Sequence, residues 1–305
     1  MNNYNKNMHK YSCINRIYYF DFYREGTVMK KNSVKKIIAA VLALAMVFCL
    51  CACGSKTESK LDKIKKAGKL VMATDACWAP FEYIGANGEP TGSDVELAAY
   101  IAEQLGVKLE VINVAFDTLP TYIVNGEADI VLAAMTITEE RKESMAFSDP
   151  YTKAEQYIVV VDGDDSVATV EDLAGKAIGV HLGTTGDLLV SDEVDGGCLK
   201  DTGASVKQYK SLPDASLALL NGELQAIVCD TLMAKNLCTA NDEKIVCFPL
   251  VYADGTKTDE EYGIGMIKGD DAFTAKINEI IAPVVADGTV DGWIVEHTEL
   301  ASNID

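Results

Sequence analysis

The sequence contains little proline, little histidine and a shortage of positive charge. Seven prolines leave room for long regular elements, and three histidines do not form a cluster that would hold a metal ion. There are 27 Lys and Arg against 46 Asp and Glu, a formal net charge of −19, which argues against nucleic acid or anionic lipid as a direct partner. Since 49% of the residues are hydrophobic, we expect a globular chain with one large or two modest domains.

The apolar run at residues 37–50 is too short for a comfortable membrane span, and lysines precede it, as in a secretory signal. The next residues, Leu50-Cys-Ala-Cys53, resemble a bacterial lipobox, with Cys53 as the lipidated thiol and Cys51 as the alternative. We therefore predict a signal peptide at 1–52, a lipidated stalk at 53–60 and a location on the extracytoplasmic face of the cell membrane. An uncleaved anchor helix is the alternative. Because residues 1–28 do not resemble a signal, Met29 is a candidate start.

Five cysteines follow Cys53, an odd number without C-x-x-C spacing. This pattern argues against a zinc site and against a disulfide-dense framework, so we predict no metal and no cofactor. A single bridge between Cys238 and Cys247 and a set of free thiols both remain open.

Strands and helices alternate along the chain in two similar series, each ending in a short polar turn. The predicted strands are 70–75, 108–114, 129–132, 156–161, 177–181, 206–209, 226–230 and 262–266. Helices are predicted at 93–105, 118–125, 212–220 and 271–286, with others opening at 183 and 290, and Ser93 with Glu96 has the spacing of a capping box. This alternation predicts an α/β protein with two lobes, each a mostly parallel sheet with flanking helices, onto one of which the last helices pack.

The stretch 129–151 joins a buried strand to a charged turn. Thr138 is a predicted N-cap, followed by Glu139 and Glu140, whose charges suit the positive end of a helix. Arg141 stands at the same end, which is unfavourable for a cation. An arginine just past the carboxyl end of a strand is a candidate for binding an anion with both arms of its guanidinium. The alternative is a surface arginine paired with Glu143 or Asp149.

Several runs, together and in this order over residues 61–300, resemble the family 3 extracytoplasmic solute-binding proteins of amino-acid ABC transporters. The runs are Thr74-Asp75 with Pro80-Phe81, Gly92-x-Asp94-Val-Glu96-Leu97, Met135-Thr-Ile-Thr-x-x-Arg141, Phe147-Ser-Asp-Pro-Tyr151, Gly183-Thr-Thr185 and Tyr262-Gly-Ile-Gly. The resemblance implies a periplasmic-binding-protein-like fold of type II. Lobe 1 would comprise 61–157 and 256–305, lobe 2 would comprise 158–255, and two hinge segments would cross near 157–161 and 249–263.

The resemblance also implies a site for a zwitterion. Arg141 would bind the α-carboxylate, and Asp230 would accept from the α-ammonium, although from the residues alone Asp230 would be the N-cap of the next helix. Asp75 would contact the ligand or brace its loop, and Trp78 and Phe116 would flank the ligand side chain. Further contacts, several through main-chain N–H groups, are implied for Ala134, Met135, Thr136, Thr184, Thr185 and Gly186.

The side-chain pocket departs from relatives that prefer basic ligands, because Ala133 and Ala134 replace hydroxyl residues. An uncharged polar amino acid is therefore favoured, with a basic one left open by Asp75 and Asp187. His181 would line the pocket or be satisfied at its strand end.

The implied function is that of a monomeric, lipid-anchored receptor that closes on a free amino acid and delivers it to an ABC permease, without enzymatic activity. The alternatives are a cleft enzyme of the same fold, such as a dehydratase of the aromatic pathway, and a ligand-sensing module.

Overall fold

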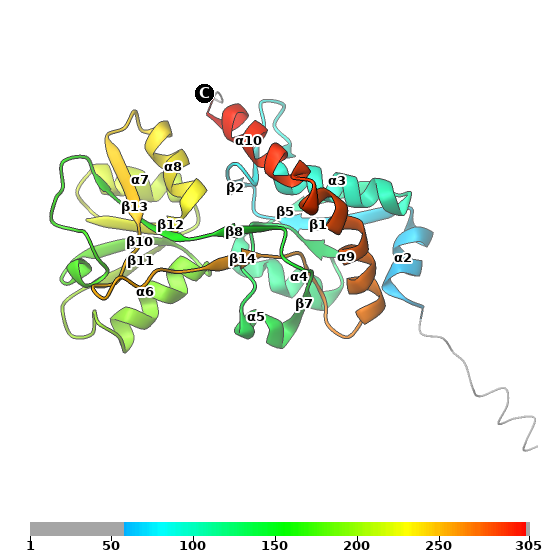
Figure 1. Cartoon of the computed structure of the whole chain (residues 1–305), viewed down its shortest axis with the longest axis horizontal. Helices are drawn as coiled ribbons and strands as arrows, with labels where there is room; N and C mark the ends of the chain where they lie inside the picture. Colours follow the sequence, from blue (N-terminus) through cyan, green and yellow to red (C-terminus); the bar gives the residue numbers. More distant parts are fainter. Residues whose placement is uncertain (1–57, 303–305) are drawn as a thin grey trace, which may run out of the picture. The chain divides into compact units, whose positions relative to one another are not determined.

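A computed structural model of the chain describes residues 58–302. These residues fold into two lobes, each built on a five-stranded sheet with helices against its faces (Figure 1). The predicted signal segment and Cys53 lie outside the described residues. Among residues 58–302, no helix combines the length and the apolar character that a membrane span requires.

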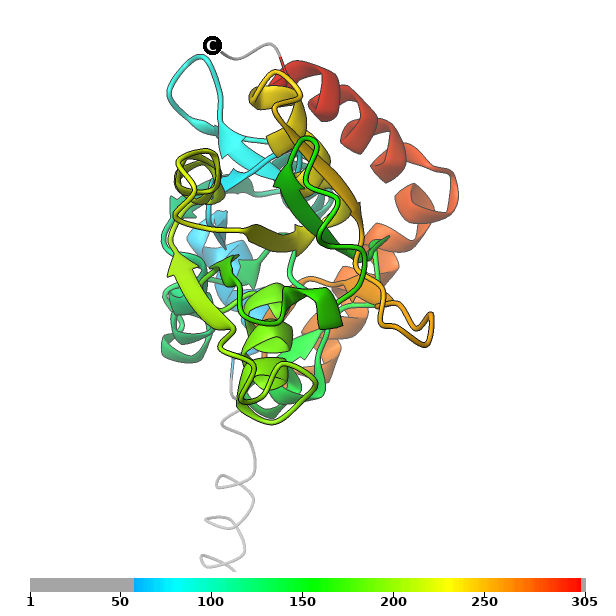
Figure 2. The same ribbon diagram turned by 90° about the vertical axis from the view of Figure 1, so that its left-hand side faces the viewer.

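The sheet of the first lobe has the strand order β5-β1-β6-β15-β7. β1 pairs in parallel with β5 and β6, whereas β15 is antiparallel to β6 and β7. The strands are β1 (Lys69–Thr74), β5 (Lys108–Asn113), β6 (Ile130–Val131), β7 (Met145–Phe147) and β15 (Gly265–Ile267). The main helices are α2 (Lys60–Ala67), α3 (Ser93–Leu105), α4 (Leu119–Asn125), α9 (Asp271–Ala286) and α10 (Thr289–Ala301). As predicted, the last two helices pack on this lobe, against each other and against α3 (Figures 1 and 2).

The second lobe repeats this arrangement with the order β11-β10-β12-β9-β13. β10 is parallel to β11 and β12, and β9 is antiparallel to β12 and β13. The strands are β9 (Gln156–Val161), β10 (Ala177–His181), β11 (Ser205–Tyr209), β12 (Ala226–Asp230) and β13 (Ile245–Pro249). The helices are α6 (Thr185–Asp195), α7 (Leu212–Leu220) and α8 (Thr231–Ala240). Each lobe thus has the predicted parallel strands and adds antiparallel strands near the places where the chain crosses.

Two short strands, β8 (Thr152–Ala154) and β14 (Glu260–Tyr262), pair antiparallel between the two sheets (Figure 1). The second predicted crossing, near 249–263, contains β14. The first prediction, a crossing near 157–161, is wrong by a few residues. Gln156 already pairs with Asp230, and Val161 pairs with Ile245, so this segment belongs wholly to the second sheet. The chain therefore crosses at Glu155, between β8 and β9.

The capping box predicted at Ser93 is also wrong. The N-cap of α3 is Gly92, which makes no side-chain cap, and its φ of 133° and the carbonyl of Phe81 leave no space for a Cβ. The first N–H groups of the helix, those of Ser93 and Asp94, donate instead to the carbonyls of Pro80 and Phe81. The preceding loop thus satisfies the helix start that a hydroxyl would otherwise cap.

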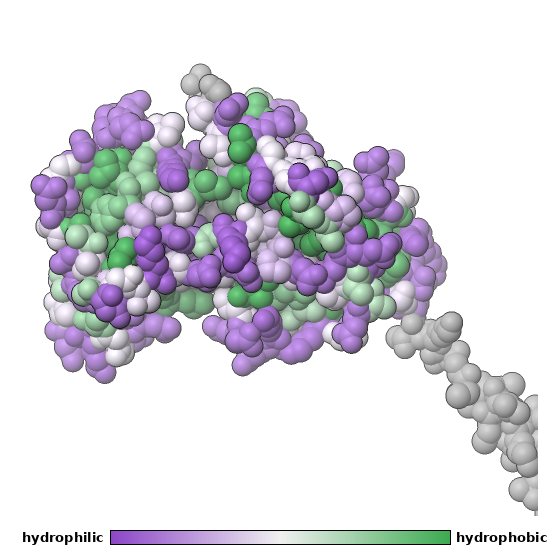
Figure 3. Space-filling model, in the orientation of Figure 1, coloured by the Kyte–Doolittle hydropathy of each residue, from purple (hydrophilic) through white to green (hydrophobic). Residues whose placement is uncertain are grey.

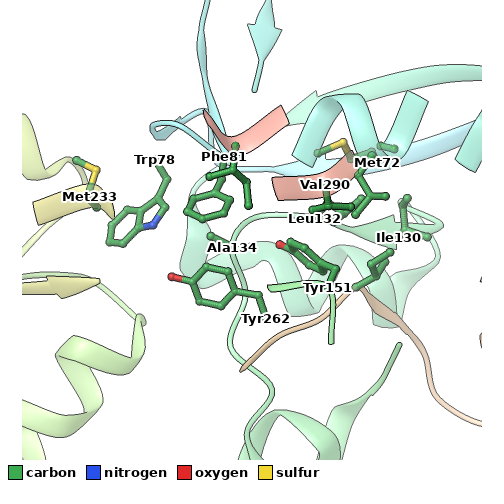
Figure 4. Packing of buried hydrophobic residues seen from close by; sticks show 14 of the residues in the cluster. Met72, Trp78, Phe81, Ile130, Leu132, Ala134, Tyr151, Met233, Tyr262 and Val290 are labelled. Carbon is green, nitrogen blue, oxygen red and sulfur yellow. The ribbon is translucent and has the colours of Figure 1, made fainter. Parts of the chain in front are cut away.

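An apolar cluster continues from one lobe into the other. Trp78 of β2 (Cys77–Trp78) lies between Phe81 of the first lobe and Met233 of α8 (Figure 4). The rings of Phe81 and Tyr262 meet edge to face with centroids 5.3 Å apart. Hydrophilic residues are spread over both lobes on the face in Figure 3. The polar site described next therefore borders a buried apolar wall that both lobes share.

Candidate functional site

The site lies where the carboxyl ends of parallel strands from both lobes meet, the usual position for ligands in open α/β sheets. β1 and β6 lead into it from the first lobe, and β10 and β12 lead into it from the second. The cavity between them is partly open to solvent. It is lined by Trp78, Phe116, Ala133, Ala134, Thr136, Arg141, Thr184, Thr185 and Asp230.

Arg141 is the central cation of this cavity. It lies on α5 (Glu139–Ser144), whose N-cap is Thr138, as predicted, with the Thr138 hydroxyl accepting from the Arg141 N–H at 3.1 Å. The guanidinium donates to the carbonyl of Thr136 at 2.7 Å and, across the lobes, to the carbonyl of Gly183 at 3.1 Å. It also lies 5.3 Å from the centre of the Phe116 ring, a cation–π distance.

Only 9% of Arg141 is exposed, so the alternative of a surface arginine paired with Glu143 or Asp149 is wrong. Burial lowers the pKa of the Arg141 guanidinium, and the negative charges of Asp230 and Glu260 oppose this effect. Arginine keeps its proton in proteins, so the cavity holds a permanent positive charge.

Asp230 supplies the opposite charge from the second lobe. It is the N-cap of α8, but its side chain makes no capping bond. Its carboxylate accepts instead from the Tyr262 hydroxyl and from the Gln156 amide. Burial, and then the charge of Glu260, raises the pKa of Asp230 to about 7. A cationic partner in the cavity would lower that pKa again and favour the ionised carboxylate.

Sequence reasoning did not identify Gln156 and Glu260 as part of the site. Glu260 accepts from the hydroxyls of Thr136 at 2.7 Å and Thr185 at 2.8 Å, and from the Gln156 amide at 3.0 Å. These bonds join residues of both lobes through β14. One signal was available in the sequence. Glu260 and Tyr262 are two residues apart on a short strand, so their side chains point to the same side.

Eight of the twelve residues that the resemblance implies line the cavity, and four lie just outside it. Met135 is fully buried in the apolar core of the first lobe, because its side chain alternates with those of Ala134 and Thr136. Gly186 is buried in the first turn of α6, where a Cβ would lie 2.8 Å from the Gln156 amide oxygen. Its missing side chain lets Gln156 reach Asp230 and Glu260.

The other two residues, Asp75 and His181, lie next to each other across the lobes. Asp75 accepts the N–H of Phe116 at 3.0 Å, which braces the loop that carries this ring. His181 is 3% exposed and has its Nε2 3.4 Å from a carboxylate oxygen of Asp75. Its ring stacks on Trp78 with centroids 5.4 Å apart. These two residues thus sit behind the aromatic pair that lines the cavity.

A second buried acidic group supports the cavity wall from the first lobe. Asp94 accepts at one carboxylate oxygen from the Ala134 N–H at 2.9 Å and from the Tyr151 hydroxyl at 2.8 Å. Burial raises the pKa of Asp94 to about 7, and burial together with Asp94 raises the pKa of Glu82 well above its ordinary value. Burial and the nearby Asp94 charge thus favour the protonated form of Glu82.

Fold and site together define a two-lobed protein whose cavity is lined by a buried cation from one lobe and a buried carboxylate from the other. The sequence pattern of the bacterial extracellular solute-binding proteins, family 3, matches residues 70–296. The chain is 33% identical over 261 residues to a probable histidine-binding protein of Neisseria gonorrhoeae, covering 85% of this chain and 94% of that one. The chain belongs to this family of extracellular solute-binding proteins.

Two solved structures show the same fold. One is an amino-acid ABC transporter substrate-binding protein of Streptococcus pneumoniae bound to L-arginine, with a TM-score of 0.73 and 27% identity. The match covers 80% of this chain and 100% of that one. The other is an ancestral amino-acid-binding protein described as a precursor of cyclohexadienyl dehydratase, with a TM-score of 0.69, 31% identity and coverage of 79% and 100%.

Proposed function

We propose that this protein binds one free amino acid between its lobes and presents the closed form to an ABC importer permease. The observation that carries the proposal is that Arg141 of the first lobe and Asp230 of the second line the same cavity. A guanidinium suits an α-carboxylate and a carboxylate suits an α-ammonium. Because the charges come from opposite lobes, a zwitterion would be held fully only when the lobes are closed.

For the ligand side chain we propose an uncharged polar group. Ala133 and Ala134 contribute only methyl groups to the cavity, and the Asp75 carboxylate already accepts the Phe116 N–H and lies beside His181. A basic amino acid is the second candidate, because the relatives described above are named for histidine or bound to arginine. A thermal-shift screen over the proteinogenic amino acids and cystine would decide between them.

The location and the moving parts are also proposals. We propose that Cys53 carries the lipid anchor, that the protein acts as a monomer, and that 61–157 with 256–305 closes against 158–255. The pairing of β8 with β14 supports two crossings between the lobes, with the first crossing at Glu155, two residues before the boundary proposed from the sequence.

We propose a binding role without catalysis, although the dehydratase precursor shows that the fold is compatible with evolution toward an enzyme. His181, the histidine beside the cavity, lies against Asp75 and Trp78 and does not line the cavity. Incubating the protein with candidate ligands, including aromatic-pathway acids, and measuring product formation tests this point. Product formation would show that the protein is an enzyme rather than a receptor.

The direct test of the site is Arg141→Ala, measured by calorimetry with the best ligand of the screen. We expect a loss of about 2–5 kcal/mol of binding free energy, at least about 30-fold in Kd, because the carboxylate would be buried without a partner. Lys142→Ala is the matched control, since the neighbouring Lys142 is exposed and pairs with Glu139 at the surface. Equal affinity of Arg141→Ala and the unmodified protein would disprove the proposed site.

A further inference from the structure

Three side chains with metal-ligating atoms meet beside the cavity although they are far apart in the sequence. One ligand atom each from Asp75, Cys77 and His181 lies within 4.8 Å of the other two. Asp75 and Cys77 follow β1 in the first lobe, whereas His181 ends β10 in the second. We propose that these three residues form a binding site for a zinc ion, assembled when the lobes close.

Two observed distances are close to those between the ligand atoms of a tetrahedral ion, although they run to different oxygens of Asp75. Zn–O and Zn–N bonds near 2.05 Å and a Zn–S bond near 2.3 Å place tetrahedral ligand atoms about 3.4–3.6 Å apart. In the structure, His181 Nε2 is 3.4 Å from Asp75 Oδ2, and Cys77 Sγ is 3.3 Å from Asp75 Oδ1. One ligand atom of each residue lies within 4.8 Å of the other two, so side-chain rotations would have to bring a single Asp75 oxygen, Cys77 Sγ and His181 Nε2 onto one ion.

The imidazole is held in place before any ion binds. His181 is 3% exposed, and its ring contacts those of Trp78 and Phe116, with centroid distances of 5.4 and 6.0 Å. Among the described residues, His181 Nδ1 has no hydrogen-bond partner. Binding an ion at Nε2 would place the ring proton on Nδ1, and the ion would take the position beside the Asp75 carboxylate.

The donor set selects the metal. Thiolate and imidazole ligands suit Zn²⁺, whereas Mg²⁺ and Ca²⁺ prefer sites made only of oxygen. Three protein ligands leave the fourth tetrahedral position for water or another small ligand. Asp75 can keep its bond to the Phe116 N–H and also bind the ion. One carboxylate offers about four lone-pair positions, and the Phe116 N–H occupies one of them.

Binding must replace the thiol proton of Cys77. Burial and the neighbouring Asp75 raise the pKa of this thiol, so the sulfur is protonated in the metal-free protein. When Zn²⁺ binds, the S–H bond breaks, the S–Zn bond forms and the proton passes to solvent, without any change of oxidation state. The net charge of the site therefore rises by one, because the ion adds two positive charges and the released proton removes one.

Cobalt(II) is a visible probe for this site, since a cobalt–thiolate bond adds a charge-transfer band in the near ultraviolet. We expect titration of the purified protein with Co²⁺ to produce this band and Zn²⁺ to remove it by displacement. Cys77→Ser should abolish the band, and Cys198→Ser, at an exposed cysteine of the second lobe, should leave it intact. Loss of the band in the control but not in Cys77→Ser would overturn the proposal.

In the second lobe, the side chains of Cys238 and Cys247 are hydrogen-bonded to each other and are the alternative thiol ligands. If the band survives Cys77→Ser and disappears in Cys238→Ser, the ion binds there and the proposed site is wrong. His181→Gln removes the one ligand that the second lobe supplies to the proposed zinc site. It should weaken Zn²⁺ binding at least about tenfold, the loss seen even for groups that only support a metal ligand.

The zinc site does not depend on the proposed amino-acid binding, and the two can fail separately. Amino-acid binding measured in a chelator tests the receptor function without metal. Absence of the cobalt band in a protein that binds its amino acid would overturn only the zinc site. Folding of each variant is checked by its unfolding midpoint without metal, which Zn²⁺ should raise in the unmodified protein and not in His181→Gln.

Discussion

Asp94 controls the shape of the cavity wall without lining it. Its carboxylate receives the N–H of Ala134, a residue with φ of 45°, in the left-handed region that alanine rarely adopts. The same oxygen receives the Tyr151 hydroxyl. One buried oxygen therefore holds a strained backbone that carries a cavity-lining residue.

Asp94 should also make folding stability depend on pH. Its folded pKa of about 7 is above the ordinary value of 3.8, mainly because it is buried. Protonation therefore favours the folded state, and this stabilisation is complete below about pH 4 and lost as the pH rises to about 7. Asp94→Asn keeps an oxygen for both bonds but cannot ionise. Relative to the unmodified protein, the variant should gain up to about 4 kcal/mol between pH 4 and pH 7, with no further gain above pH 7.

Thermal unfolding at intervals from pH 4 to pH 8 measures this difference. Comparing the two proteins at each pH cancels groups that titrate in both, among them His297, whose pKa is lowered by burial. Asp214→Asn, at an exposed position of α7, is the control and should show a constant difference. A constant difference for Asp94→Asn as well would mean that Asp94 does not titrate in this range.

The short helix α5 positions the Arg141 side chain in the cavity. It has six residues, too few to be stable by itself, so its cap and its packing decide its position. Thr138→Ala removes the bond from the Thr138 hydroxyl to the Arg141 N–H and should destabilise the protein by about 1 kcal/mol. We also expect weaker ligand binding, but with a smaller loss than for Arg141→Ala, because the guanidinium remains.

Thr138→Ser keeps a hydroxyl at the cap and is the matched control. Urea unfolding and ligand calorimetry of both variants measure the two effects separately. If Thr138→Ala lost stability without any change in affinity, the cap would support the fold but would not position Arg141.

Elements of this kind could be predicted from the sequence when their signals were local. The alternation of strands and helices, the Thr138 cap and the resemblance that pointed to Arg141 all rest on residues close together in the chain. The start of α3 at Ser93 was predicted correctly, but its capping was not, because its first N–H groups bond to the loop at Pro80 and Phe81 rather than to a side chain. Local patterns do not contain such partners.

Contacts between distant segments were the main omission at the site. Glu260 belongs to a three-residue strand whose partner, β8, lies more than a hundred residues earlier in the chain, where Glu260 pairs with Ala154. Gln156 reaches Glu260 only because Gly186 has no side chain. The meeting of Asp75, Cys77 and His181 likewise depends on the two lobes being together. Apart from the two-residue spacing of Glu260 and Tyr262, the sequence carries no signal for these contacts.

For the whole molecule, the property that matters is how closely the two lobes can approach. Gly183 lies at their contact, with φ of 80° and its position for a Cβ 3.3 Å from Asp117 Cβ in the first lobe. Its carbonyl accepts from Arg141 across the same gap. Any side chain at Gly183 must therefore push the lobes apart or displace the backbone near Phe116.

Gly183→Ala should accordingly weaken ligand binding, because it penalises the closed form more than the open form. We expect a loss of about 1 kcal/mol in binding, roughly fivefold in Kd, in addition to strain of about 1–2 kcal/mol from alanine in the left-handed region. Calorimetry gives the first quantity and denaturant unfolding gives the second.

Gly222→Ala is the control that separates the effect of backbone strain from the effect on lobe closure. Gly222 also lies in the second lobe, with φ of 78° and no atom within 4 Å of a Cβ, so its substitution introduces similar strain without touching the first lobe. It should lose stability like Gly183→Ala and keep the affinity of the unmodified protein. If both variants lost affinity equally, the loss would come from strain in the second lobe. The approach of Gly183 to Asp117 would then not limit closure.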